Sequence, residues 1–473
     1  MITSTVIAQQ LPILILISFD GFRHDYLSPT LTPNLFDLSK QATLGHMESM
    51  YITKTFPNHF SIATGLYEDE HEIINNKMYD PRLNDTFTPA NTATEWWNYR
   101  GTNMPIWTAN QVIAEELGQK RYSASMMYPG SSTPYRDTLP THLKEYAKNA
   151  DWTENVDTVI NWLTDPERPA NFVSMYFDEP DTVAHNYGPW GQETLDAVRR
   201  VDSAAGYLVK RLRDVGLAPR TNIIFVSDHG MAEVRNVVYM SDFIDTSSFI
   251  LQGNSPDWSV FVKPEKRHLK AKIFQDLLAA SKKYHYRVYK RADIPPELHY
   301  SKSVRIGDFF ILAREKYDLF LERPQVVKPL PQVWGNHGWK PSNRDMRPLF
   351  MAYGPSFRKD YNHLSVFPNI DLFPLMVFLL GLPSASLPNN GSLARIVDVI
   401  DVTHFEEGDE TIKLAYIVLL GALLLSLTGV VFTLFASAKR PKYKPDVEFD
   451  DLAPGLNIDL RYYLSGYHRI PPS

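Results

Sequence analysis

Residues 223–230 of this chain read IIFVSDHG. An apolar run followed by Asp228 and His229 is typical of a buried parallel strand that carries polar side chains at its carboxyl end. In open α/β sheets, binding and catalytic sites form where such strands end. The stretch therefore predicts an α/β fold in which Asp228 and His229 belong to a site at one edge of the sheet.

Two further stretches repeat this construction. Residues 11–17 are apolar and lead to Asp20 in an Asp-Gly turn. Residues 172–177 lead to Asp181 and then to His185. Because the carboxyl ends of parallel strands meet at one edge of a sheet, we expect the three carboxylates to lie close together. A single Asp-Gly turn or histidine is usually structural, so this prediction depends on the three stretches taken together.

Residues 54–59 read KTFPNH. Thr55 stands two residues before Pro57, and proline is favoured in the first turn of a helix. A hydroxyl at that point suits either a plain helix cap or a bound anion such as a phosphate, because free N–H groups and the positive end of the helix dipole face it. Asn58, one turn further along, is expected within reach of the same anion.

A fourth stretch, GNHG at residues 335–338, places His337 in a segment that suits a tight loop. Together the four stretches supply the candidate ligands Asp20, Asp181, Asp228, His185, His229, His337 and Thr55. Mixed nitrogen and oxygen ligands suit zinc, and a pair of metals about 3.5–4 Å apart suits in-line phosphoryl transfer. The pattern thus indicates a metal site at the sheet edge.

On these residues the chain resembles the ectonucleotide pyrophosphatase/phosphodiesterase family of the alkaline-phosphatase-like superfamily, from about residue 11 to about residue 402. It resembles the single-pass members, which carry a C-terminal membrane anchor. The resemblance implies an α/β fold with a mostly parallel sheet flanked by helices. The chain departs from the family pattern at Ala184 and Glu72, where glycine is usual, and in having no cysteine.

The resemblance also implies a role for each site residue. Thr55 would be the nucleophile, and two Zn²⁺ ions would be the cofactors. One ion would be held by Asp20, Thr55, Asp228 and His229, and the other by Asp181, His185 and His337. The expected substrate contacts are Asn58 at the phosphate, Phe56 and Tyr146 stacked on a base, and Lys77 at a phosphate or the ribose.

The implied activity is hydrolysis of nucleoside triphosphates or dinucleoside polyphosphates at the α-phosphate through a covalent threonine intermediate. Two alternatives stay open. One is a choline lysophospholipid phosphodiesterase, against which the long loop expected at residues 77–107 speaks, because the lipid-cleaving relatives tend to be shortened there. The other is a catalytically silent cell-surface adhesion module, against which the complete ligand set speaks.

The composition is that of a globular protein: 473 residues, 44% of them hydrophobic and 22% charged, with a formal net charge of −6. Lys and Arg are scattered along the sequence, so we expect no nucleic-acid-binding surface. Without cysteine, no disulfide can form. We expect a catalytic domain at residues 11–403 that contains a small α+β insertion at residues 250–330.

Residues 414–438 are apolar and long enough to cross a hydrocarbon core of about 30 Å. An acidic stretch at residues 404–413 precedes them, and the tail at residues 439–473 begins with basic residues. The positive-inside rule places that tail in the cytoplasm and the catalytic domain outside the cell or in a lumen; a buried core helix is the alternative. The sequons at Asn84 and Asn390 would then be open to glycosylation.

Overall fold

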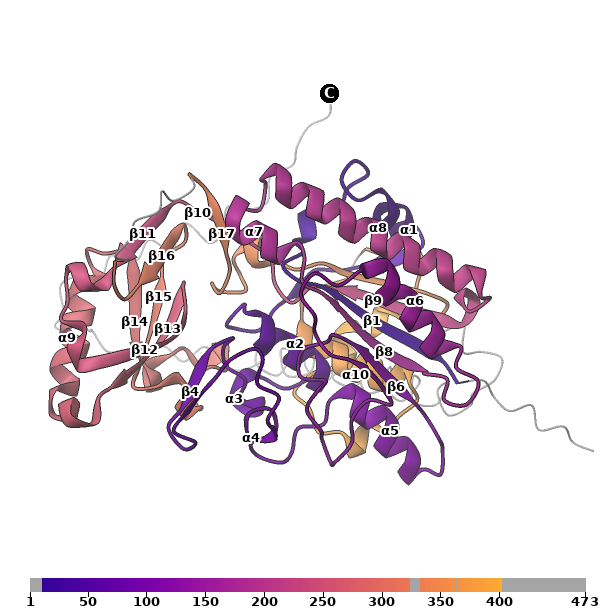
Figure 1. Ribbon diagram of the computed structural model, residues 1–473, viewed down its shortest axis with the longest axis horizontal. Coiled ribbons are helices and arrows are strands. Elements are labelled where there is room, and N and C mark those ends of the chain that lie inside the picture. Colours follow the sequence, from indigo (N-terminus) through magenta and orange to yellow (C-terminus); the bar gives the residue numbers. More distant parts are fainter. Residues whose placement is uncertain (1–10, 324–331, 363, 402–473) are drawn as a thin grey trace, which may run out of the picture. The chain divides into compact units, whose positions relative to one another are not determined.

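A seven-stranded mixed sheet forms the centre of the computed structural model, which describes residues 11–323, 332–362 and 364–401 (Figure 1). In spatial order its strands are β2 (Ala42–Leu44), β18 (Phe350–Tyr353), β9 (Thr221–Val226), β1 (Ile13–Phe19), β8 (Phe172–Phe177), β6 (Ser123–Met126) and β7 (His142–Lys144). The five strands from β9 to β7 run parallel, whereas β18 is antiparallel to both β9 and β2. The predicted α/β fold is confirmed, and β18 and β2 make its sheet mixed.

The three strands expected to carry the site lie side by side. β1, β8 and β9 are buried along their whole length, which explains why their sequences are continuous apolar runs. Phe19 of β1 pairs with Phe177 of β8, and Ser18 pairs with Val226 of β9. Because of this register, the three strands end at the same edge of the sheet.

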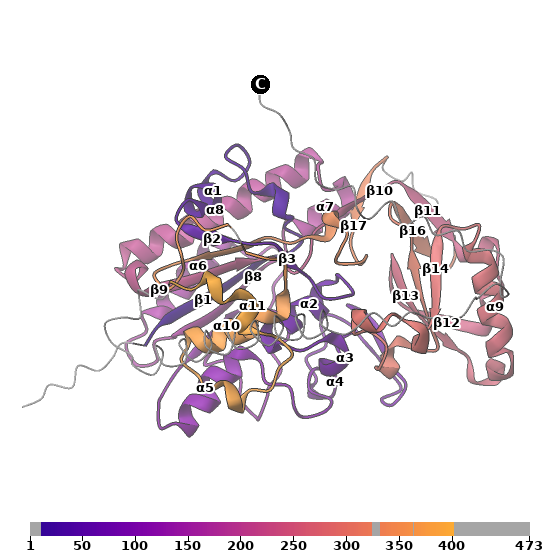
Figure 2. The ribbon, with the colours of Figure 1, turned by 180° about the vertical axis from the view of Figure 1, so that it is seen from behind.

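Helices cover both faces of the sheet (Figures 1 and 2). One layer holds α1 (Pro33–Ser39), α6 (Trp152–Leu163), α7 (Asp181–Tyr187) and α8 (Gln192–Asp214), and the other holds α2 (Thr55–Thr64), α5 (Ile106–Glu116) and α10 (Leu372–Leu379). In α8 the buried residues recur every three or four positions, as Val201, Ala205 and Leu208 do, so one stripe of the helix packs on the core. The carboxylate of Asp151 caps the first turn of α6.

A second, antiparallel sheet lies where the sequence predicts an α+β insertion. Its strands, in order, are β12 (Phe249–Asn254), β13 (Asp257–Val262), β15 (Phe309–Ala313) and β14 (Tyr286–Lys290), and the helix α9 (Lys270–Ser281) packs on it. Two two-stranded ribbons flank this segment: β11 (Asn236–Tyr239) with β16 (Tyr317–Phe320), and β10 (Ala232–Val234) with β17 (Trp334–Asn336). β17 returns the chain to His337.

The segment 77–107 is more ordered than the long loop expected from the sequence. It contains a hairpin of β4 (Met78–Asp80) and β5 (Asp85–Phe87) and the short helix α4 (Thr94–Trp97). Trp96 and Trp97 are each 1% exposed and belong to the main core. Strands of three residues are too short to show an alternating pattern, which is why the sequence alone did not reveal them.

The predicted acidic stalk, membrane helix and cytoplasmic tail, residues 404–473, lie outside the described part of the chain. Within the part that is described, no helix combines the length and the apolar character needed to cross a bilayer. Both sequon asparagines, Asn84 and Asn390, are exposed, as a glycosylated residue must be. Glycosylation at these positions stays a prediction.

Candidate metal centre and active-site pocket

The carboxyl ends of β1, β8 and β9 bring three aspartates together. Asp20 follows β1 directly, and its N–H donates to the oxygen of Phe177 at 2.9 Å. Asp181 opens α7, and its N–H donates to the oxygen of Asp20 at 3.1 Å. Asp228 follows β9 and accepts the N–H of Gly21 at 3.2 Å. Hydrogen bonds from backbone N–H groups therefore hold the three aspartates at one sheet edge.

One group of ligand-type atoms consists of Asp181, His185 and His337, whose ligand atoms all lie within 4.8 Å of one another. His185 follows Asp181 by one turn of α7, and its Nε2 lies 3.3 Å from Asp181 Oδ2. His337 comes from the loop after β17, and its Nε2 lies 3.5 Å from Asp181 Oδ1. The Asp181 carboxylate thus faces two imidazoles.

A second group adjoins the first. His229 Nε2 lies 2.9 Å from Asp228 Oδ2, 3.4 Å from Asp20 Oδ1 and 3.3 Å from Thr55 Oγ1. The ring of His229 stacks on that of His337 with 3.5 Å between the centroids. The structure therefore brings together all seven residues that the sequence singles out as candidate ligands.

The hydrogen bonds of the three histidines show which ring nitrogen is free. In each of them Nδ1 lies 2.8–3.0 Å from a backbone carbonyl oxygen. Because a carbonyl can only accept, each Nδ1 carries a proton, and in the neutral imidazole each Nε2 presents a lone pair. The facing atoms are Asp20 Oδ1, Asp181 Oδ1 and Asp228 Oδ2, which are buried and accept no hydrogen bond from the described residues. Facing lone pairs repel, so this donor set fits divalent cations placed between them.

The electrostatics of the cluster also favour a cation. Burial raises the pKa of Asp20 well above its usual value, and the charges of Asp228 and Asp181 raise it further. Burial lowers the pKa of His337, which keeps its imidazole neutral. Burial opposes the ionisation of Asp181, but the charge of a protonated His185 works against burial, and the pKa of Asp181 is lowered; a bound cation would take the place of that proton. Carboxylates crowded in this way are costly unless positive charge lies between them.

Thr55 is the first residue of α2, and it is 7% exposed. Its hydroxyl contacts His229 Nε2 rather than an N–H group of its own helix. In the first turn of α2, Pro57 has no N–H and the N–H of Phe56 donates to Asn76 Oδ1, which leaves the N–H of Thr55 without an acceptor among the described residues. Of the two interpretations of the KTFPNH stretch, the geometry supports the site hydroxyl over the plain helix cap.

A pocket of about 550 Å³ opens beside Thr55. Phe56 and Tyr146, the predicted base-stacking residues, both line it. Tyr146 is 53% exposed, and its hydroxyl donates to Asp178 Oδ2 at 2.8 Å. Lys77 is exposed and is not among the lining residues, so its contact with a substrate stays a prediction.

The predicted role of Asn58 as a donor to the phosphate does not fit the structure. The side chain is fully buried, and its polar atoms are already occupied. Its partners are Ile52 O at 2.8 Å, Lys54 O at 3.0 Å, Met50 N at 2.7 Å and Asn369 Nδ2 at 2.9 Å. Asn58 therefore fixes the segment that leads into α2. The motif spacing could not show this, because it does not reveal which partners the fold supplies.

Asn76 places a different amide beside the nucleophile candidate. Its Oδ1 accepts the N–H of Phe56, the residue after Thr55, at 2.9 Å, and its amide NH₂ group donates to no described residue. The sequence did not single out Asn76, because it comes from a separate loop with no motif of its own. An alignment of related sequences is the kind of signal that would have found it.

Two further polar residues support the cluster from the sheet and from α2. Tyr176 of β8 donates its hydroxyl to Asp20 Oδ2 at 2.5 Å. His59 lies one turn after Thr55, with its Nδ1 2.8 Å from the carbonyl oxygen of Thr55 and its Nε2 2.8 Å from Ser18 Oγ. Tyr176 was hidden inside an apolar strand, whereas the spacing of His59 from Thr55 could have been read from the sequence.

This fold and site define a metal-dependent hydrolase of the alkaline-phosphatase-like α/β class. Comparison with known proteins agrees. The family model described as type I phosphodiesterase / nucleotide pyrophosphatase matches residues 14–340. The human bis(5'-adenosyl)-triphosphatase ENPP4 is 35% identical over 389 residues, 81% of each chain. Human ectonucleotide pyrophosphatase/phosphodiesterase family member 5 is 29% identical over 393 residues, 82% of this chain and 78% of the relative.

Solved structures show the same likeness. Murine ENPP5, as an inactive threonine-to-alanine variant in complex with AMP, superposes with a TM-score of 0.74 at 29% identity, covering 83% of this chain and 100% of that one. Human ENPP5 gives a TM-score of 0.73. The chain belongs to the type I phosphodiesterase / nucleotide pyrophosphatase family, whose members are hydrolases.

Proposed function

We propose that this chain hydrolyses dinucleoside polyphosphates or nucleoside triphosphates at the α-phosphate and releases a nucleoside monophosphate. The main support for the proposal is the position of the Thr55 hydroxyl. It lies 3.3 Å from His229 Nε2, and Thr55 lines the pocket of about 550 Å³. The activity in the name of human ENPP4 supports this substrate class, and the inactive threonine-to-alanine variant of murine ENPP5 supports a threonine nucleophile.

Two zinc ions are the proposed cofactors, since carboxylate and imidazole ligands of this mix suit zinc. Asp20, Thr55, Asp228 and His229 would hold one ion, and Asp181, His185 and His337 the other. When bound, the ions would lower the pKa of the Thr55 hydroxyl and of a water molecule and would neutralise phosphate oxygens. The carbonyl partners of the histidine Nδ1 atoms would keep each Nε2 aimed at its ion.

The side chains divide the remaining work. Thr55 Oγ attacks the α-phosphorus, the remaining polyphosphate leaves, and water then cleaves the threonine ester to restore the hydroxyl. The N–H of Thr55 and the Asn76 amide donate to the charged phosphate oxygens, the role that the sequence assigned to Asn58. Phe56 and Tyr146 hold the base by stacking.

The lining of the pocket favours a diester over a monoester. It includes Glu145 and Asp178 and, among the residues that the structure describes, no lysine or arginine. A phosphate monoester presents one more charged oxygen than a diester, and a bidentate arginine is the side chain best suited to clamp it. We therefore expect simple phosphomonoesters to react far more slowly than diadenosine triphosphate.

We place this activity at the cell surface. Relatives named ectonucleotide pyrophosphatase/phosphodiesterase support an exported catalytic domain. Residues 414–438 are the proposed single membrane helix, with residues 439–473 in the cytoplasm. The lysophospholipid phosphodiesterase and the silent adhesion module are the alternatives that the following experiment distinguishes.

Purified zinc-loaded chain is offered diadenosine triphosphate, ATP, lysophosphatidylcholine and a simple phosphomonoester, and the products are separated by chromatography. We expect AMP and ADP from the dinucleotide, and AMP and pyrophosphate from ATP. Thr55→Ala should lower turnover at least about a thousandfold, because the covalent route is lost. Thr92→Ala, which removes another threonine of the same pocket, should have little effect.

Each other result points elsewhere. ADP and free phosphate from ATP would contradict cleavage at the α-phosphate. Cleavage of lysophosphatidylcholine alone would favour the lipid enzyme. No turnover of any substrate with both metals bound would favour the adhesion module.

A further inference from the structure

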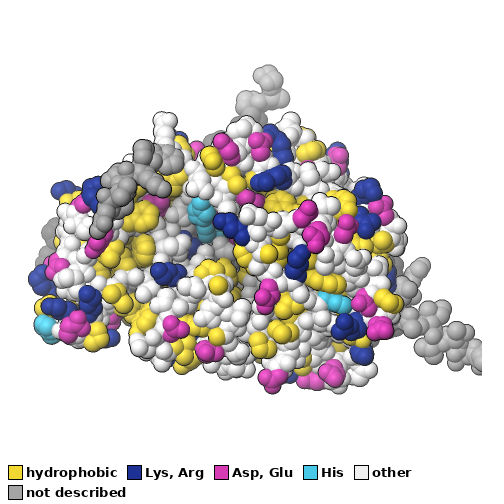
Figure 3. Space-filling view, in the orientation of Figure 1, with side chains coloured by type: hydrophobic (Ala, Val, Ile, Leu, Met, Phe, Trp, Pro, Cys, Tyr) yellow, Lys and Arg dark blue, Asp and Glu magenta, His cyan; other side chains and the backbone are white. Residues whose placement is uncertain are grey.

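One segment of the insertion is strongly basic. Residues 263–292 contain ten Lys or Arg residues and two Asp or Glu residues, whereas the whole chain has a formal net charge of −6. This segment comprises η5 (Pro264–Leu269), α9 and β14. Figure 3 shows Lys and Arg side chains gathered at the edge that α9 occupies.

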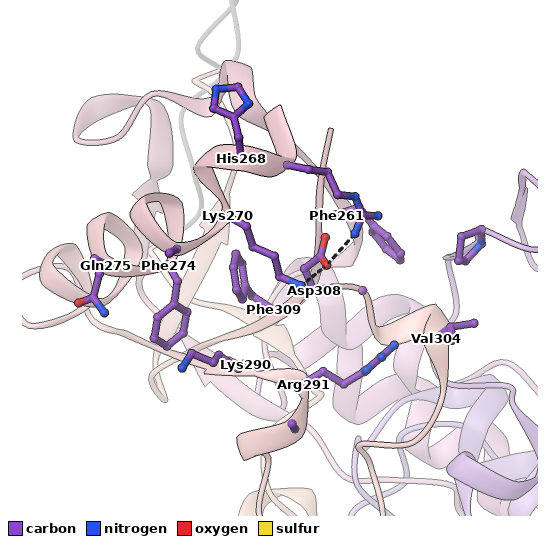
Figure 4. Close-up of a pocket in the computed structure, with 15 residues that line it drawn as sticks. Phe261, His268, Lys270, Phe274, Gln275, Lys290, Arg291, Val304, Asp308 and Phe309 are labelled. Carbon is purple, nitrogen blue, oxygen red and sulfur yellow. Dashed lines mark hydrogen bonds and ion pairs between the residues drawn. The ribbon is translucent and has the colours of Figure 1, made fainter. Parts of the chain in front are cut away.

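A pocket of about 790 Å³ lies within this region, and it shares no lining residue with the active-site pocket. Arg267 and Lys270 line one wall, and Lys290 and Arg291 line another (Figure 4). Asp308 is the one acidic residue in the lining. The pocket therefore has four permanent positive charges and a single negative one.

Asp308 cannot neutralise these cations. Its Oδ1 is shared by Lys270 Nζ at 2.7 Å and Arg267 at 3.7 Å, and its Oδ2 accepts the N–H of Val262 at 2.9 Å. Lys290 lies 4.0 Å from its nearest carboxylate, on Asp293, which points to weak pairing. Among the described residues, the guanidinium of Arg291 donates to one acceptor, the backbone oxygen of Ser303, at 3.4 Å. Positive charge is thus left over on the wall formed by Lys290 and Arg291.

The aromatic rings of the pocket argue against single-stranded nucleic acid as its ligand. Sequence-tolerant nucleic-acid binding needs exposed ring faces on which bases stack. Phe309 is 1% exposed and Phe274 is 9% exposed, so both rings serve mainly as an apolar floor. Phe261, the third ring of the lining, is partly exposed and packs edge-to-face with Tyr79, with 5.1 Å between the centroids. The ammonium group of Lys270 lies 5.9 Å from the ring centroid of Phe309, and that of Lys290 lies 5.1 Å from the ring centroid of Phe274. These cation–π contacts hold both ammonium groups over the aromatic rings.

We propose that this pocket binds a compact polyanion, a molecule that carries several phosphate or sulfate groups close together. Clustered tetrahedral anions match converging lysine and arginine side chains, and arginine can bind such groups through two parallel hydrogen bonds. A soluble polyphosphorylated small molecule and a sulfated oligosaccharide share this chemistry. The site stands apart from the proposed catalytic centre, so its occupation is independent of the proposed hydrolysis.

Isothermal titration calorimetry on the purified full-length chain tests the proposal at about 0.15 M salt, where weak surface attraction is screened. The probes are inositol hexakisphosphate, a sulfated heparin-derived hexasaccharide and a single-stranded oligonucleotide of equal charge. The test variant is Lys290→Glu/Arg291→Glu. The matched control is Lys282→Glu/Lys283→Glu, which makes the same charge change in the same basic segment but outside the pocket lining.

We expect one equivalent of a compact probe to bind the wild type, at least about tenfold weaker binding by the pocket variant, and a change of no more than about twofold in the control. The tighter of the two compact probes identifies the source of the anion. Hydrolysis of diadenosine triphosphate should be unchanged in both variants, which shows that they fold. Equal weakening in both variants, no binding of either compact probe, or preference for the oligonucleotide would overturn the proposal.

Discussion

Lys54 Nζ lies 3.4 Å from Asp257 Oδ2, and both side chains are fully buried. Lys54 directly precedes Thr55, whereas Asp257 opens β13 of the insertion. A side chain at Gly338 would collide with both members of the pair, so the loop that carries His337 also packs against it. This ion pair therefore links the start of α2, the insertion and the loop that carries His337.

Lys54→Met should lower the free energy of unfolding by about 3–5 kcal/mol, because Asp257 is left buried without its partner. Burial already raises the pKa of Asp257 to about 6 with Lys54 opposite it. Without Lys54 the pKa of Asp257 should rise further, and a protonated Asp257 does not need the partner, so the loss should be largest at alkaline pH and should shrink as pH falls toward about 6. Urea unfolding at several pH values measures this. Lys54→Met/Asp257→Asn should recover part of the loss, and a double variant no more stable than the single one would contradict the pairing.

Glu72 occupies a left-handed backbone conformation, with φ of 65°, where the family usually has glycine. Its carboxylate pairs with Arg82 at 2.5 Å and with Arg100 at 3.0 Å, which offsets the backbone cost. Glu72→Ala should therefore be less stable than Glu72→Gly by about 1 kcal/mol, because both lose the ion pairs but only glycine relieves the backbone. Denaturant midpoints of the two variants decide this, and an alanine variant as stable as the glycine variant would refute it.

Glu68 is a buried carboxyl at the start of the short helix α3 (Glu68–His71). Both of its side-chain oxygens are buried without a hydrogen-bond partner, and burial raises its pKa well above the usual value. With such a group, the free energy of unfolding of the chain falls as pH rises from the pKa of the unfolded state through the pKa of the folded state. Glu68→Met should therefore stabilise the chain by about 1–3 kcal/mol at about pH 7.5, and by less at about pH 5. Glu70→Gln on the same helix is the control, since Glu70 is paired with Lys302 at 3.0 Å and should give no gain.

Metal analysis tests the ligand assignment without any activity measurement. We expect two zinc ions per chain, one fewer after either Asp181→Asn or Asp228→Asn, and no change after Asp178→Asn, which alters the same pocket outside the ligand groups. Metal content should fall as pH is lowered, because protons compete for the carboxylate and imidazole ligands. A full complement of zinc in both ligand variants would show that the metals bind elsewhere.

The strand ends of the site could be predicted from the sequence because each depends on a local pattern. Asp20 and Asp228 follow continuous apolar runs, and such runs mark buried parallel strands whose carboxyl ends share one edge. His185 follows Asp181 by four residues, so their joint placement on one helix face was also readable. These local patterns account for most of the ligand cluster.

The rest depends on contacts between distant parts of the chain. Asn76 reaches the backbone of Phe56 from 20 residues away, and no motif around either residue reveals the contact. Asn58 looked free within its motif but is occupied by partners that include Asn369. In the same way, Lys270 and Lys290 look unrelated along the sequence until α9 and β14 bring them to one pocket.

The most direct test of Thr55 as the nucleophile is to trap the covalent intermediate. The wild-type chain is mixed with diadenosine triphosphate, quenched in acid within one turnover, and digested for mass spectrometry. We expect the peptide that contains Thr55 to gain one adenylyl group, and Thr55→Ala to gain none while still binding zinc. Rapid turnover with no adenylylated peptide, or an adenylyl group on another residue, would contradict the assignment of Thr55.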